Sequence, residues 1–171
     1  MGSPFWNFSL AVYSAGAVRD ECLDLQDQFG VDVNLVLLCA FLGAVHGVAL
    51  TSDDIAGARE TVQQWQEQVV RPLRAARRNL KTVELQDSQD ATAAMQLRVQ
   101  VKAAELEAER TEQMMLERWA EARLATWPRG KAGDAVPANL QALLAAYGIG
   151  RERLADAQSI IAAALSQTVS E

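Results

Sequence analysis

Glycine and proline are scarce in this chain, with ten glycines and four prolines among 171 residues. Flexible linkers and disordered chains are usually enriched in one or both, so the composition favours a folded protein. Histidine occurs once, as His46, and the residue three positions before it is Gly43. A di-iron helical bundle uses two Glu-x-x-His motifs, so that class is excluded. We predict that His46 lies at the end of a helix.

Cysteine is also rare, and the two cysteines, Cys22 and Cys39, form no C-x-x-C motif. Half of the residues are hydrophobic, so a chain of this size can bury a core without the help of a disulfide. We therefore predict that both cysteines are reduced thiols inside the core.

The chain lacks an excess of basic residues: its net charge is −6 and its pI is about 4.9. General binding to nucleic acid requires a dominant basic surface, so the charge argues against that function. The longest apolar run, Leu35 to Leu50, has 16 residues. A membrane-spanning helix needs about 20, so we expect a buried core helix and no transmembrane segment. The first residues, MGSPFWNF, lack the basic start of a secretory signal, which makes the cytoplasm the expected location.

Motifs of known catalytic chemistry are missing as well. The sequence contains no G-x-S-x-G nucleophile elbow and no glycine-rich phosphate loop of the G-x-x-x-x-G-K-[ST] type. The adjacent acids Asp53 and Asp54 would point about 100° apart on a helix, so they do not form a shared magnesium site. They fit the first turn of a helix, where the helix dipole favours acids. We predict no cofactor and no metal, and we regard a non-enzymatic role as the better hypothesis.

What the chain does have is apolar spacing typical of helices along almost its whole length. The sequence predicts an all-α fold, a compact bundle of about six to seven helices with one long helix in the C-terminal half. Ser3-Pro4 is a helix start signal, Gly30 fits a C-terminal cap, and Asp32 fits an N-cap. Pro72 should kink or split the fourth helix near Gln68 to Arg71. The predicted helices are 4–15, 17–28, 33–45, 52–81 with that break, 91–124, 137–147 and 151–166.

The expected organisation has two parts. Residues 1–82 form an N-terminal helical core, and residues 83–171 form a long helix followed by a helical hairpin, and we expect the two parts to pack together as one domain. In the long helix the predicted contact stripe follows near-heptad spacing, and many of its positions are small. The stripe consists of Leu97, Val101, Ala104, Ala108, Thr111, Met115 and Ala122.

A concentrated run of basic residues is the first candidate site. It contains Arg71, Arg74, Arg77, Arg78 and Lys81. The segment 71–82 has five basic residues and no acid, whereas residues 1–70 carry a net charge of −7 and residues 83–171 a net charge of −4. One interpretation is a solvated face that pairs with the acids between Glu105 and Glu121. The other is a docking surface for an acidic protein, an anionic lipid or a phosphate.

A polar cluster before the long apolar run is the second candidate site. It contains Gln26, Asp27, Asp32 and Asn34. These side chains flank a predicted helix–turn–helix corner, where they can cap helices and satisfy buried backbone groups. The alternative is a small polar pocket at the base of the apolar core.

The N-terminal half also resembles a known family. The matching segments are Phe5 to Leu10 with Tyr13, Cys22 to Leu37, and Pro72 to Lys81. They are similar to those of an uncharacterised proteobacterial family of proteins, domain of unknown function 2390. The resemblance covers about the first 80 residues and implies a bacterial cytosolic protein, but it supplies no substrate and no catalytic residue.

Two functional hypotheses follow from the sequence. The first is a non-enzymatic interaction or adaptor protein that uses the basic helix face, with an acidic protein or anionic ligand as its partner. The alternative is a small-molecule binding protein or enzyme with a polar pocket near Asp27, Asp32 and Asn34.

Overall fold

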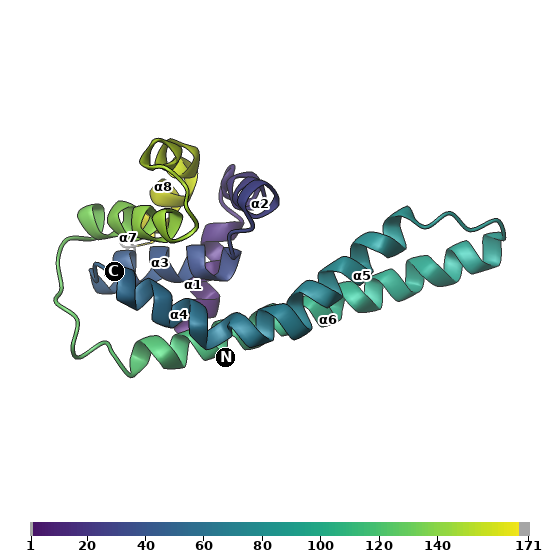
Figure 1. Cartoon of the computed structure of the whole chain (residues 1–171), viewed down its shortest axis with the longest axis horizontal. Coiled ribbons are helices and arrows are strands. Elements are labelled where there is room, and N and C mark those ends of the chain that lie inside the picture. Colours follow the sequence, from purple (N-terminus) through teal and green to yellow (C-terminus); the bar gives the residue numbers. More distant parts are fainter. Residues whose placement is uncertain (1, 168–171) are drawn as a thin grey trace. The chain divides into compact units, whose positions relative to one another are not determined.

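The computed structural model describes residues 2–167, and in that range the chain is helical without a β-strand (Figure 1). Its elements are α1 (Pro4–Tyr13), α2 (Val18–Phe29), α3 (Val33–His46), α4 (Ser52–Trp65), the π-helix η1 (Gln66–Val70), α5 (Arg71–Thr82), α6 (Ser88–Glu121), α7 (Ala132–Ala146), the 3₁₀-helix η2 (Arg151–Ala157) and α8 (Gln158–Ser166). The all-α prediction and the long helix in the C-terminal half are confirmed.

The helix ends follow local capping chemistry. The Ser3 hydroxyl accepts a hydrogen bond from the Trp6 amide at 3.1 Å, and Pro4 occupies the first helical position of α1. Gly30 ends α2 with a left-handed backbone, φ +68°, which glycine adopts without a steric penalty. The Asp32 carboxylate then caps α3 through the Asn34 amide at 2.9 Å. These three sequence predictions are confirmed.

Pro72 breaks the regular helix where the sequence predicts a break. Because proline has no amide hydrogen and its ring crowds the carbonyl one turn earlier, the α-helical hydrogen bonds before it cannot continue unchanged. The chain forms the five-residue π-helix η1 at this point, and the Arg71 amide donates to the Gln66 carbonyl five residues earlier. The helix changes its winding here without ending, and α5 follows directly.

Two predicted helices differ in detail from the observed ones. The helix expected to start at Pro137 starts at Ala132, and Pro137 lies inside it. This early turn tolerates the proline because only one intrahelical bond, from residue 137, is lost. The helix expected over 151–166 begins instead as 3₁₀-helix and becomes α-helical at Gln158.

The chain divides into two compact units, and the divisions fall within α4 and α6. The core unit contains the described residues up to Thr61 and those from Gln113 onward, and the hairpin unit is Val62–Glu112. The prediction that residues 1–82 and 83–171 pack as one domain stays a prediction.

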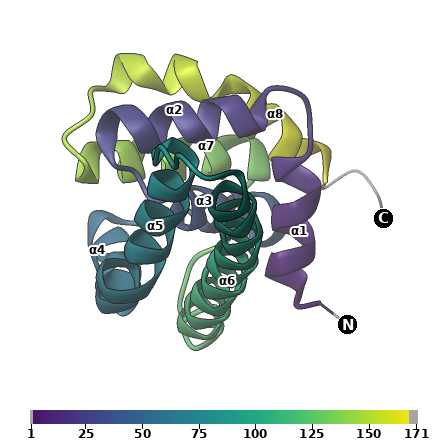
Figure 2. The same cartoon turned by 90° about the vertical axis from the view of Figure 1, so that its right-hand side faces the viewer.

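Helix α3 forms the centre of the core unit. From Asn34 to Ala44 it is buried on every side, and it packs against α1, α2, α7 and α8 (Figure 2). Cys22 and Cys39 are both buried free thiols, as predicted, and burial raises the pKa of the Cys22 thiol to about 12. His46 is the last residue of α3, also as predicted. Burial, with a smaller effect of nearby Arg129, lowers the pKa of its imidazole.

The buried side chain of Asn139 links α7 to α3 and to the segment that follows α3. The Asn139 side chain is fully buried and donates to the carbonyls of Cys39 at 3.0 Å and Val48 at 2.8 Å. Its oxygen accepts from the Leu50 amide at 2.7 Å. One side chain therefore bonds to the Leu50 amide and the Val48 carbonyl and gives the helical Cys39 carbonyl an additional donor. A buried backbone group left without a partner costs about 1–3 kcal/mol.

The contact between α3 and α7 requires a glycine at position 43. A Cβ atom added there would lie 2.8 Å from the Val136 amide nitrogen and 2.9 Å from its Cα, both of which are backbone atoms. We expect Gly43→Ala to lower the free energy of unfolding by about 1–3 kcal/mol, as overpacked cores do. Denaturant melts measure the loss.

Gly133→Ala is the matched control, because a Cβ at this helical glycine meets nothing within 4 Å. The control should leave stability unchanged or raise it by up to about 1 kcal/mol. Equal stability of Gly43→Ala and wild type would contradict the close approach of the two helices.

Candidate functional site

The basic run lies on α5, which forms a helical hairpin with α6. The two helices run side by side in Figures 1 and 2 and are joined by residues 83–87. Asp87 starts α6, because its carboxylate accepts hydrogen bonds from the amides of Gln89 at 2.6 Å and Asp90 at 3.3 Å. The hairpin places the basic residues of α5 opposite the acidic residues in the second half of α6.

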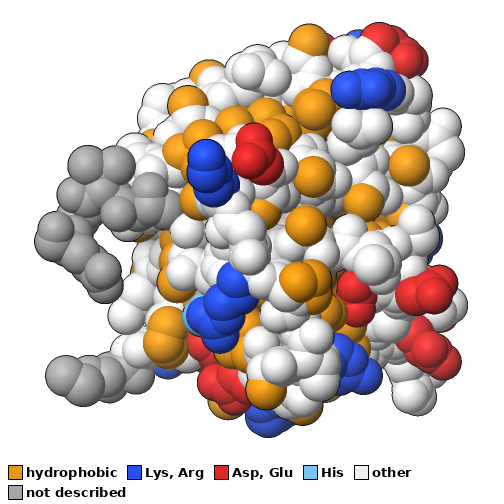
Figure 3. Space-filling view, turned by 90° about the vertical axis from the view of Figure 1, so that its left-hand side faces the viewer, with side chains coloured by type: hydrophobic (Ala, Val, Ile, Leu, Met, Phe, Trp, Pro, Cys, Tyr) orange, Lys and Arg blue, Asp and Glu red, His pale blue; other side chains and the backbone are white. Residues whose placement is uncertain are grey.

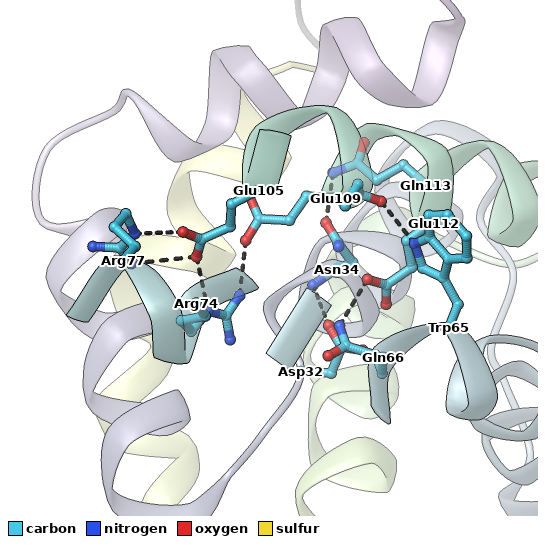
Figure 4. A network of polar contacts seen from close by, with 11 residues as sticks. Asp32, Asn34, Trp65, Gln66, Arg74, Arg77, Glu105, Glu109, Glu112 and Gln113 are labelled. Carbon is cyan, nitrogen blue, oxygen red and sulfur yellow. Dashed lines mark hydrogen bonds and ion pairs between the residues drawn. The ribbon is translucent and has the colours of Figure 1, made fainter. Parts of the chain in front are cut away.

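Arg74 and Arg77 pair with acids of α6 (Figure 4). Arg74 donates from Nε to Glu105 Oε1 at 3.1 Å and from Nη2 to Glu109 Oε1 at 2.7 Å. Arg77 donates from Nε to Glu105 Oε2 and from Nη2 to Glu105 Oε1 at 3.2 Å. For Arg74 and Arg77, the structure has the internal pairing with downstream acids that one interpretation of the sequence described.

The ion pairs are poorly exposed to water. Glu105 is only 6% exposed, and the Arg74 side chain is 18% exposed. Burial by itself would raise the pKa of the Glu105 carboxyl, but the hydrogen bonds from Arg77 and Arg74 outweigh it and hold this pKa below its ordinary value. Burial likewise opposes the charge of Arg74, and its bonds to Glu105 and Glu109 raise the guanidinium pKa. The charges therefore stabilise one another.

Further polar side chains join the helices of the hairpin unit nearer its base. Gln66, in the π-helix, donates from Nε2 to the fully buried Glu112 carboxylate at 2.7 Å. The Trp65 indole donates to the Ala108 carbonyl at 2.9 Å. Gln66 thus bonds to a buried carboxylate of α6, a contact that the sequence pattern did not indicate.

The inward-facing positions of α6 differ from the predicted stripe. In the part of α6 that belongs to the hairpin unit, buried or half-buried residues recur at Ala94, Arg98, Val101, Glu105, Ala108 and Glu112, which follow a regular seven-residue repeat. Val101 and Ala108 belong to the predicted stripe, but Leu97 and Ala104 are exposed. The prediction assigned the contact positions to apolar and small residues, whereas the charged residues Arg98, Glu105 and Glu112 occupy three of them.

The remaining basic residues, Arg71, Arg78 and Lys81, are exposed on α5. They lie on the same helix as Arg74 and Arg77. Elsewhere the charges are more mixed: on the face in Figure 3, basic and acidic side chains alternate with hydrophobic ones. The exposed cations of α5 therefore stand out as a local concentration of positive charge in an acidic chain.

In the second candidate site, the polar corner, Asp32 and Asn34 form hydrogen bonds with other groups of the protein. Asn34 is buried, and its side-chain oxygen accepts from Gln113 Nε2 at 2.9 Å. Besides capping α3, Asp32 donates its amide to the Tyr147 hydroxyl at 3.3 Å. Gln26 is half-buried and Asp27 is exposed on α2. Asp32 and Asn34 thus act at the start of α3, and the bonds from Gln113 and Tyr147 come from residues far away in the sequence.

In residues 2–167, no group of three or more His, Cys, Asp and Glu side chains is arranged to hold a metal ion. Over the same residues, each helix is too short or too polar to cross a membrane.

Comparison with protein families matches residues 4–116 to the family described as "Protein of unknown function (DUF2390)". The chain belongs to this family. The match includes the polar corner and the ion pairs of Arg74 and Arg77, so both candidate sites lie in the family region of this DUF2390 protein. Neither the curated proteins nor the solved structures compared with it contain a match.

The depressed pKa of Glu105 predicts a pH-dependent contribution to stability. A carboxyl whose pKa is lower in the folded than in the unfolded state stabilises the fold above the unfolded value, and this stabilisation disappears as the pH falls through the folded value. Glu105→Gln removes the titrating group. We expect the wild type to exceed this variant in stability most at pH 7, and the difference to shrink once the pH falls below about 4.5, the ordinary value.

Glu107→Gln is the control, because Glu107 is exposed on the same helix and the substitution changes the net charge equally. Urea melts from pH 3 to 7 compare the three proteins. A pH-independent difference between wild type and Glu105→Gln would show that the ion pairs contribute nothing to folding.

The capping role of Asp32 predicts a stability loss in Asp32→Ala. The variant leaves the Asn34 amide without its acceptor, and we expect a decrease of about 0.5–2 kcal/mol in the free energy of unfolding. Asp24→Ala removes the same charge from an exposed position of α2 and should not destabilise. Increased stability of Asp32→Ala in denaturant melts would instead favour the polar-pocket hypothesis, because binding sites often retain unfavourable polar groups.

Proposed function

We propose that this DUF2390 protein is a non-enzymatic interaction module that binds an acidic partner through the exposed cations of α5. The main support for the proposal is that residues of one basic run differ in their surroundings. Arg74 and Arg77 bond to Glu105 and Glu109, whereas Arg71 and Lys81 are exposed to solvent on the same helix. The hairpin therefore carries exposed positive charge beside the arginines that pair within it.

The electrostatic argument supports a partner rather than a purely structural role for these cations. Like charges spaced three or four residues apart on a helix cost a few tenths of a kcal/mol each, and Arg71 and Arg78 flank Arg74 at such spacings. The acids of Glu105 and Glu109 offset the charge of the inner arginines. An acidic partner would offset the charge of exposed Arg71 and Lys81 and would also be steered toward them from a distance.

The alternative, a small-molecule binding protein or enzyme at the Gln26–Asn34 corner, has less support. Its central side chains, Asp32 and Asn34, are already hydrogen-bonded to groups of the protein. The cytoplasmic location and the bacterial origin expected from the sequence stay predictions.

A double charge reversal at exposed positions tests the proposal. Arg71→Glu with Lys81→Glu should abolish partner capture when the tagged protein is purified from cells that carry its gene, because the surface then repels an acidic partner. The wild-type complex should also weaken steeply between about 50 and 300 mM salt, where the Debye length falls from roughly 14 to 6 Å. Quantitative mass spectrometry of the retained proteins measures both effects.

The comparison variant is Arg74→Glu, which replaces an internally paired arginine. It should destabilise the protein in denaturant melts, since it places a third acid beside Glu105 and Glu109. The outer double reversal should leave stability nearly unchanged or raise it at low salt. Partner capture that survives the outer reversal and is insensitive to salt would refute the proposed function.

A further inference from the structure

The ion pair between Arg74 and Glu109 defines the register of the hairpin, and this register places two lysines opposite each other. Arg74 Nη2 lies 2.7 Å from Glu109 Oε1. In packed antiparallel helices, seven residues forward along one helix correspond to seven residues back along the other. Lys81 of α5 therefore lies opposite Lys102 of α6, and both are exposed. Where the preceding two turns have an arginine and a glutamate, this part of the hairpin has two cations.

The same step along α6 leads from Glu105 to a third cation, Arg98, in an inward position. Glu105 accepts hydrogen bonds from Arg77, so the residue opposite Arg98 in a continued helix would be Glu84. Helix α5 ends at Thr82, however, and Figure 1 shows α6 extending beyond that end. Glu84 thus lies in the exposed connection between the helices, where the helical register no longer places its carboxylate against Arg98.

Arg98 has a buried hydrogen-bond donor that the protein does not use. Its Nε atom is buried and has no hydrogen-bond partner within residues 2–167, although the residue as a whole is half-buried. A buried donor without a partner is unfavourable. The Arg98 side chain can therefore turn toward an external acceptor without losing a hydrogen bond of Nε, and a bond to that acceptor would satisfy the donor.

Helix stability does not account for all three charges. Lys81 lies in the last turn of α5, where the helix dipole favours a cation. Arg98 and Lys102 lie in the interior of α6, four residues apart, and like charges at this spacing destabilise a helix. The nearest acid in the sequence of α6, Glu105, already accepts hydrogen bonds from two arginines of α5. An anion from another molecule would offset the remaining charge.

The number of cations favours a phosphate monoester as this anion. Such a group carries a charge of about −1.5 to −2 at pH 7 and has three acceptor oxygens, whereas a carboxylate has one charge and two oxygens. A planar guanidinium bonds to two oxygens of a phosphoryl group at once, and lysine ammonium groups supply flexible point charges beside it. A single carboxylate would neutralise a smaller part of the charge.

A nucleic acid is a less suitable source of phosphate. Binding along a strand requires a basic surface that contacts many phosphates, and this chain has a net charge of −6. A phosphorylated side chain instead presents one concentrated charge to one small group of cations.

We infer that Lys81, Arg98 and Lys102 bind a phosphorylated side chain of the acidic partner. This inference rests on the proposed function and names the chemical group that the partner presents. The Arg98 guanidinium turns outward and bonds to two phosphoryl oxygens, while Lys81 and Lys102 approach the group from the two helices.

A titration of the purified full chain with N-acetyl-phosphoserine amide tests the chemistry of the site. In NMR spectra at constant ionic strength, the Nε–H resonance of Arg98 and the amides next to Lys81 and Lys102 should shift and saturate. Acetate and dimethyl phosphate, each with one negative charge, should bind at least about tenfold more weakly, a difference of 1.4 kcal/mol at 25 °C. Equal affinity for the three compounds would overturn the inference.

Two substitutions in the site have a matched control on the same helix. Arg98→Met and Lys102→Gln should each weaken binding of the phosphoserine compound at least about tenfold, and circular dichroism checks that both variants are folded. Lys102 is exposed, so its replacement leaves the inference testable even if Arg98→Met does not fold. Arg118→Met changes the net charge equally at an exposed position of α6 outside the hairpin unit and should bind like wild type. Equal weakening by Lys102→Gln and Arg118→Met would contradict a specific site.

Partner capture from cells that carry the gene separates this inference from the proposed function. Phosphatase treatment of the lysate should abolish partner retention, and Lys102→Gln should reduce it at least about tenfold. If retention requires Arg71 and Lys81 but is insensitive to phosphatase and to Lys102→Gln, the phosphoryl inference fails and the proposed function stands. If retention requires none of these cations, both fail. Binding of the phosphoserine compound with phosphatase-insensitive retention would indicate a free phosphate ester as the ligand and would also overturn the inference.

Discussion

A single carboxylate, that of Glu105, holds two arginines of the neighbouring helix in the hairpin unit. It is nearly buried and accepts hydrogen bonds from Arg74 and Arg77, which lie one turn apart on α5. A buried charge is tolerated only when it is paired and hydrogen-bonded, so any slip of α5 along α6 would leave charges without partners. Pairing of these charges therefore specifies the register of α5 against α6, because few apolar residues lie between the two helices.

This use of charge inside the hairpin explains why its outside is unusual. Glu105 and Glu112 occupy inward positions of α6, and apolar Met95, Val99 and Leu106 lie outward. A helical hairpin that folded for its own stability alone would be expected to show the reverse pattern. Such an inversion is intelligible if the outer side chains contribute to a complex, which connects the internal ion pairs to the proposed role in binding.

Features determined by neighbouring residues were predictable from the sequence, whereas features determined by distant ones were not. The caps at Ser3 and Asp32 and the break before Pro72 follow from local backbone chemistry, and they occur as expected. The predicted helix start at Pro137 was wrong because proline can also lie inside the first turns of a helix, as it does in α7.

The candidate sites were predictable only in part, for the same reason. Residues 71–81 were identifiable from their charge alone. The choice of Glu105 as the partner of both Arg74 and Arg77 depends on the relative phase of two helices, and an apolar stripe cannot reveal a buried carboxylate. Likewise, Gln113 is 79 residues from Asn34, and nothing local indicates that their side chains meet.

The most direct test of this account is a double-mutant cycle between Arg77 and Glu105. Arg77→Met, Glu105→Gln and the double variant are compared with wild type, with native-state hydrogen exchange of the α5 amides as the measure of hairpin stability. The account predicts a favourable coupling energy of about 0.5–3 kcal/mol, as expected for interacting neighbours. Additive effects of the two substitutions, with no coupling beyond experimental error, would contradict the claim that this ion pair holds the hairpin together.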